Sequence, residues 1–183
     1  MTPDEIKQTW NDAARRFYNP TPEELMKMYQ SGKTTALDNL AQKYRRFSIL
    51  GFVMALLSIQ FLINKALILD DSMRYIVTIA FMLYFALASS IDHWLSKGVA
   101  SINCYTMPVS EVAAKALYYK KIHHRSMIIL IPFALALIGL LGYALRSEEW
   151  FILGIACGFL VGAIIGVRQY IEFMSLYRRL TSD

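Results

Sequence analysis

The sequence predicts an all-α polytopic membrane protein: four transmembrane helices in two hairpins, accompanied by cytoplasmic amphipathic helices. Composition is the first reason, because 56% of the 183 residues are hydrophobic and only 18% are charged, and the mean hydropathy is +0.36. Soluble domains carry a larger share of charge. The second reason is a set of four long uncharged runs. The third is the uneven distribution of basic residues among the segments that separate these runs.

The four runs contain no Asp, Glu, Lys, Arg or His. They are 18, 17, 20 and 18 residues long: Phe47–Asn64, Tyr75–Ile91, Ser126–Leu145 and Trp150–Val167. About 20 residues of helix are needed to cross a hydrocarbon core of roughly 30 Å. Four such runs cannot all be buried inside one soluble domain of this size. The sequence therefore predicts four spans, in hairpins covering residues 47–94 and 126–169.

The basic residues predict the orientation of these spans. If the first span leads out of the cytoplasm, segments 1–46, 92–125 and 168–183 are cytoplasmic, and they hold eight, five and three of the 19 Lys and Arg residues. Cytoplasmic segments of membrane proteins are enriched in these residues. The distribution predicts a multi-pass membrane protein with both termini in the cytoplasm.

The net charge of +5 is then explained by contact with anionic headgroups, and we expect no direct binding of nucleic acid. Basic side chains flank the first and third spans and are predicted to anchor the protein at the membrane surface: Arg45, Arg46, Lys120, Lys121 and Arg125.

The cytoplasmic segment 1–46 reads as three amphipathic helical pieces. Thr21 is the expected N-cap of the middle piece, Pro22 suits its first position, and Gly32 is placed to end it. About 46 residues are too few for an ample core of their own. The segment must therefore pack on the rest of the protein, lie on the membrane or bind a partner. The residues predicted to bind a partner form its apolar face: Trp10, Phe17, Leu25, Met28 and Tyr29.

The cytoplasmic loop 95–125 contains another amphipathic helix, and residues 170–183 form a cytoplasmic tail. Pro108 marks the expected start of the loop helix. The apolar positions that follow have helical spacing: Val109, Val112, Ala113, Ala116 and Tyr119.

Glycine recurs at every fourth position of the last span, at Gly154, Gly158, Gly162 and Gly166. Small residues at this spacing let helix backbones approach closely in lipid. The favoured interpretation is packing on the third span, which offers Gly139 and Gly142. Homodimerisation through the same face and a conducting or gating role are the alternatives.

No catalytic residue, metal site or cofactor is predicted. Asp92 and His93 stand at the inner end of the second span, where they fit a polar helix end better than a proton relay or a metal site. His123 and His124 are adjacent and project from a helix about 100° apart, which does not suit joint chelation. They are therefore expected to belong to the basic anchor. No acidic residue lies deep in a span, and no hydrolase, metalloprotease, phosphate-binding or redox motif occurs.

Two stretches carry a family resemblance: KTTALDNLAQKYRRFS (33–48) and YTMPVSEVAAKALYYKKIHHR (105–125). They resemble small uncharacterised inner-membrane proteins of the Bacteroidetes type, which are thought to accompany extracytoplasmic-function sigma factors. The resemblance implies a non-enzymatic, anti-sigma-like regulator of the bacterial inner (cell) membrane. Its cytoplasmic helices would bind a soluble partner, a sigma factor or another regulator. The chain lacks the His/Cys zinc signature of one large anti-sigma class. A structural membrane protein and a small channel or transporter subunit, a homo-oligomer assembled through the glycine repeat, are the alternatives.

Overall fold

The computed structural model describes Glu5, Gln8 and residues 22–63, 71–146 and 149–181. These residues form four long helices and one short one, without a strand: α2 Pro22–Leu57, α3 Gln60–Ile63, α4 Asp71–Ala100, α5 Val109–Ala144 and α6 Glu149–Thr181. Each long helix is apolar and long enough to cross a membrane. The all-α fold class with four candidate spans is confirmed, and the protein is a multi-pass membrane protein.

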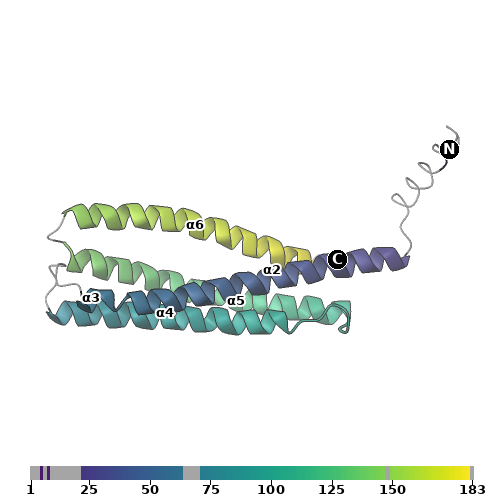
Figure 1. Ribbon diagram of the computed structural model, residues 1–183, viewed down its shortest axis with the longest axis horizontal. Helices are drawn as coiled ribbons and strands as arrows, with labels where there is room; N and C mark the ends of the chain where they lie inside the picture. Colours follow the sequence, from purple (N-terminus) through teal and green to yellow (C-terminus); the bar gives the residue numbers. More distant parts are fainter. Residues whose placement is uncertain (1–4, 6–7, 9–21, 64–70, 147–148, 182–183) are drawn as a thin grey trace.

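The four long helices form one elongated bundle (Figure 1). Helix α2 contacts α4, α4 contacts α5, α5 contacts α6, and α6 returns to α2. The start of α2, the turn between α4 and α5, and the end of α6 lie toward the same end of the bundle, and the first turns of α2 extend beyond that turn (Figure 1). The segments predicted to be cytoplasmic therefore share one end. Which side of the membrane this end faces stays a prediction, as does the pairing of the spans into hairpins.

Spans and amphipathic segments form continuous helices. Helix α5 begins after Pro108, as predicted, and continues through Ala144. Its 36 residues correspond to about 54 Å of α-helix, whereas the hydrocarbon core is about 30 Å thick. A large part of each long helix must therefore stand outside the hydrocarbon. Residues 22–46, 92–125 and 168–181 lie beyond the uncharged runs, at the end of the bundle where α2 begins and α6 ends. We call this part of the bundle the collar.

The predicted helix end at Gly32 is wrong, although the predicted start at Pro22 is confirmed. Gly32 does not adopt the positive φ of a C-capping glycine, and α2 continues through it. An internal glycine costs a helix roughly 1 kcal/mol, but the turns that follow are held by tertiary packing, because Ala36 and Leu40 are buried. The expected N-cap Thr21 and the expected first helical piece lie outside the described residues.

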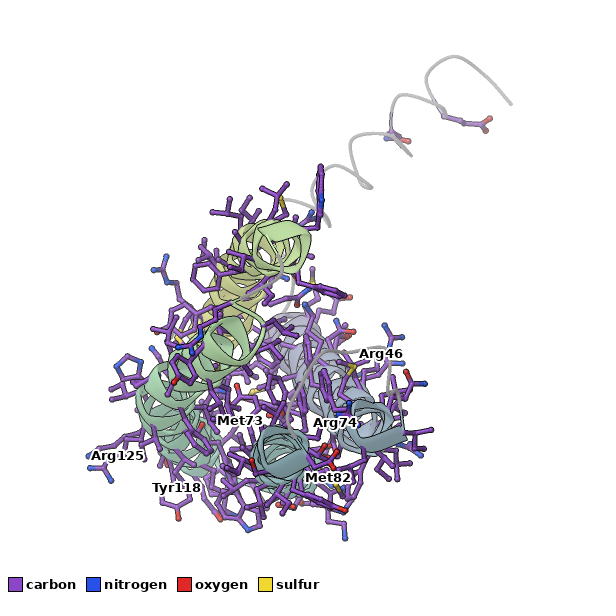
Figure 2. All side chains as sticks on the ribbon, turned by 90° about the vertical axis from the view of Figure 1, so that its left-hand side faces the viewer. Arg46, Met73, Arg74, Met82, Tyr118 and Arg125 are labelled. Carbon is purple, nitrogen blue, oxygen red and sulfur yellow. The ribbon has the colours of Figure 1, made fainter. Side chains whose placement is uncertain are left out.

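Most of the buried apolar side chains of the described chain lie in the collar. They form one cluster with contributions from all four long helices: Ala36, Leu37, Leu40, Tyr44, Leu95, Val99, Ile102, Cys104, Val112, Ala116, Phe173, Leu176, Tyr177 and Leu180. By contrast, no residue of 150–172 is buried, and α6 diverges from the other helices toward the far end (Figures 1 and 2). The hydrophobic effect, which drives burial of apolar side chains in water, does not act between helices in lipid. This difference accounts for a buried cluster in the collar and its absence along residues 150–172.

Where two spans do pack closely, small residues make the contact. A Cβ added to Gly51 of α2 would lie 3.0 Å from the Ser89 Cβ of α4. The Ser89 hydroxyl donates a hydrogen bond to the Ser48 carbonyl oxygen, with 2.6 Å between the oxygens. Close backbone approach and an interhelical hydrogen bond are the interactions that join helices in lipid. This contact fixes α2 against α4 within the uncharged runs, next to the collar.

We expect Leu40→Ala to destabilise the protein strongly, because Leu40 is fully buried in the collar cluster. Truncating a buried leucine to alanine costs about 2–5 kcal/mol. The matched control is Leu56→Ala in the same helix, where the side chain is 65% exposed and faces lipid in the predicted topology. Thermal unfolding in lipid nanodiscs measures both. Equal losses of stability for the two variants would contradict the placement of the core in the collar.

Candidate functional site: the collar

The centre of the collar is a pair of buried tyrosines from the first and last long helices. Tyr44 of α2 and Tyr177 of α6 are fully buried, and their hydroxyl oxygens are 3.0 Å apart. Burial raises the pKa of both hydroxyls, so both stay protonated and one donates to the other. This hydrogen bond ties α2 to α6 within the collar.

His123 brings α5 to the same point. Its ring centroid lies 5.5 Å from that of Tyr44 and 5.0 Å from that of Phe173. The side chain is 1% exposed, and its Nε2 has no hydrogen-bond partner in the described structure. Burial, with a smaller contribution from neighbouring His124, lowers the pKa of His123 to about 4. The imidazole is therefore neutral at neutral pH and acts as an apolar packing group, not as part of the basic anchor.

A sequence signal for this contact was available and was missed. The stretches YRRF (44–47) and YRRL (177–180) place a tyrosine before two arginines in the first and last helices. In the structure both tyrosines are buried, whereas the following pairs, Arg45–Arg46 and Arg178–Arg179, are exposed. The repeated pattern marks the two positions where a buried tyrosine is followed by two exposed arginines.

An ion-pair cluster lies beside the tyrosines. Lys43 of α2 pairs with Glu172 of α6, and Arg168 Nε lies 3.4 Å from a Glu172 carboxylate oxygen. The hydrogen bond from Lys43 is the main cause of a lowered pKa of Glu172. Next to the cluster is a polar groove of about 260 Å³ between α2 and α6, where Arg46 and Arg179 are exposed. Neither arginine pairs with a carboxylate of the described residues.

Of the five residues predicted to bind a partner, the structure describes the side chains of two, Met28 and Tyr29. Met28 is 68% exposed, but Tyr29 is half-buried and faces Cys104, Val109 and Val112 across a small gap between α2 and the start of α5. The Lys33 ammonium donates a hydrogen bond to the Tyr29 hydroxyl. Two further predicted residues, Trp10 and Phe17, lie outside the described residues, and Leu25 belongs to α2 without a described side chain.

Four of the five predicted anchoring residues are exposed: Arg45, Arg46, Lys121 and Arg125. The fifth, Lys120, is half-buried and borders a groove of about 460 Å³ between α5 and α6, together with Lys121 and His124. Figure 2 shows Arg46 and Arg125 on different sides of the bundle. Basic side chains thus surround the bundle near the level where the uncharged runs begin, although anchoring to lipid stays a prediction.

The favoured interpretation of the glycine repeat, packing on the third span, is wrong for this fold. A Cβ added to any of six glycines would have no atom of another described helix within 4 Å: Gly139, Gly142, Gly154, Gly158, Gly162 and Gly166. The physical reason is that α5 and α6 meet mainly in the collar, and α6 then diverges. The glycine face, meaning Gly154, Gly158, Gly162 and Gly166, is left open, so its role in self-association stays a prediction.

Among the described residues, no three or more His, Cys, Asp or Glu side chains come together in a group that could hold a metal ion. His124 instead places its Nδ1 3.1 Å from the Tyr170 hydroxyl oxygen.

Comparisons with protein-family models, curated proteins and solved structures find no match to this chain. The resemblance to proteins that accompany sigma factors therefore stays a prediction.

We expect Tyr44→Phe to destabilise the protein more than the double variant Tyr44→Phe/Tyr177→Phe does. The single variant leaves the buried Tyr177 hydroxyl without its hydrogen-bond partner, which costs about 1–3 kcal/mol, whereas removal of both hydroxyls leaves no unpaired group. A double-mutant cycle on unfolding in mixed micelles measures the coupling. Additive effects of the two substitutions would show that the hydroxyls do not form this bond.

Proposed function

We propose that this is a non-enzymatic protein of the bacterial inner membrane whose collar faces the cytoplasm and docks a soluble regulatory protein, in the manner of an anti-sigma factor. The observation that carries the proposal is the first part of α2. It extends beyond the rest of the bundle (Figure 1), and Met26 and Met28 on it are 56% and 68% exposed. Methionine is common at surfaces that bind other proteins, because its flexible thioether adapts to the partner.

The packing of α2 limits where such a partner could bind. Ala36, Leu37, Leu40 and Tyr44 are used in the collar cluster, so this part of α2 has no free apolar face. A soluble partner would therefore contact the turns before Tyr29. The cytoplasmic orientation is supported by the concentration of 16 of the 19 Lys and Arg residues in the three segments predicted to be inside.

Site-specific photocrosslinking in cells tests this proposal in the full-length chain. A benzophenone amino acid at position 28 is expected to capture one soluble protein, whose identity shows whether it is a sigma factor. The same group at Asp38, an exposed position further along α2, is the matched control. Adducts at position 28 that contain only lipid or a second copy of the chain, or equal adducts at both positions, would contradict the proposal.

A second candidate function is a self-associating membrane protein, such as a channel subunit, assembled through the glycine face. The open space beside these four glycines favours it. A glycine face that is open to lipid does not stabilise a single helix, whereas a second helix could approach this face closely and pack against it.

We expect Gly158→Leu to convert oligomers to monomers if this second candidate is correct. Ala156→Leu is the matched control, because Ala156 is also small and exposed and lies about 200° away around the helix. Single-molecule photobleaching of the labelled protein in native-membrane nanodiscs counts the subunits. A wild-type chain that is already monomeric, or equal disruption by both variants, would rule out assembly through this face.

A further inference from the structure

A groove of about 480 Å³ runs between α4 and α5 where the collar meets the spans. Its walls are apolar and include Leu87 and Ile91 of α4 and Ile129 and Leu130 of α5. These four residues lie within the second and third uncharged runs. This part of the groove is therefore placed to lie at the depth of hydrocarbon.

Small side chains make the groove hollow. Ser90 and Ser126 line it between the larger apolar residues. Their hydroxyls donate to backbone carbonyls of their own helices, Ser90 to Ala86 at 2.7 Å and Ser126 to His123 at 2.8 Å. With these donors satisfied, neither serine requires water, and the hollow suits an apolar chain.

The collar end of the groove is basic and aromatic. Arg125 and Trp94 border it just beyond the uncharged runs. Arg125 is exposed and pairs with no carboxylate of the described residues, and no acidic side chain lines the groove. Figure 2 shows Arg125 and Tyr118 on the outer side of α5. Trp94 and Tyr118 are 48% and 57% exposed, as expected for aromatic residues at a membrane–water interface.

We propose that this groove binds one anionic phospholipid of the leaflet on the collar side, with an acyl chain between α4 and α5 and the phosphate at Arg125. The groove changes from apolar to cationic along its length, at the depth where a phospholipid changes from acyl chain to phosphate. Arginine recognises phosphate through several N–H donors at once. A soluble peptide does not fit this gradient, because the apolar part of the groove lies within the predicted spans.

Native mass spectrometry of the full-length protein, taken from nanodiscs with equal amounts of phosphatidylglycerol and phosphatidylcholine, tests the proposal. We expect one retained lipid, with phosphatidylglycerol preferred. Arg125→Gln should weaken this preference on the order of fivefold, the effect of about one basic residue at a membrane surface. Arg179→Gln, which removes an exposed collar arginine outside the groove, should not.

Filling the hollow tests the acyl-chain part separately. Ser90→Leu should lower retention of both lipids, whereas Ser72→Leu, at an exposed serine near the other end of α4, should leave it unchanged. Thermal unfolding of each variant shows whether it is folded. If Ser90→Leu does not fold, the lipid preference of Arg125→Gln, a change at the surface, tests the proposal instead. Equal retention of the two lipids by the wild type, equal effects of the two arginine variants, or a second copy of the chain crosslinked at Ser90 would overturn the proposal.

Discussion

Water is present at only part of this molecule, and that constraint determines where its helices are held together. In the collar, apolar side chains of all four long helices are buried against one another. The Tyr44–Tyr177 hydrogen bond joins the first helix to the last. Along the uncharged runs most side chains face outward, and there the driving force that fills the collar is absent, because lipid tails are as apolar as leucine. The spans are positioned by the collar and by a few contacts between small residues, such as Gly51 with Ser89.

This arrangement explains why the proposed binding surfaces lie around the collar. Helices that pack tightly at one end and diverge toward the other leave grooves between neighbouring pairs. Three of these grooves have basic side chains at their borders: Lys43, Arg46 and Arg179 between α2 and α6, Lys120 and Lys121 between α5 and α6, and Arg125 between α4 and α5. The first turns of α2 reach beyond the cluster and keep Met26 and Met28 exposed. Contacts with lipid and with a soluble protein, as proposed, would therefore use different parts of the bundle.

Hydropathy and local signals predicted the four spans and the helix starts at Pro22 and Pro108, because these depend on nearby residues and on the length of a bilayer-crossing helix. The predicted helix end at Gly32 is wrong because tertiary packing of the turns after it outweighs the low helix propensity of one residue. The glycine repeat predicts a face suited to close approach, but sequence spacing cannot tell which helix, if any, occupies it. The burial of Tyr44, Tyr177 and His123 depends on contacts between residues up to 133 positions apart, and only the repeated Tyr-Arg-Arg pattern hinted at it.

The central claim is that the collar stands in water on the inner side while the uncharged runs lie in lipid. Cysteine accessibility tests it most directly, with single cysteines at Asp38 in the collar, Leu56 in the first span and Arg146 at the opposite end, in a chain whose Cys104 and Cys157 are replaced by serine. In sealed cells a membrane-impermeant maleimide should label only Arg146→Cys. After permeabilisation of the inner membrane Asp38→Cys should react as well, and Leu56→Cys should react in neither case. Labelling of Leu56→Cys in the native membrane, or of Asp38→Cys in sealed cells, would contradict the account.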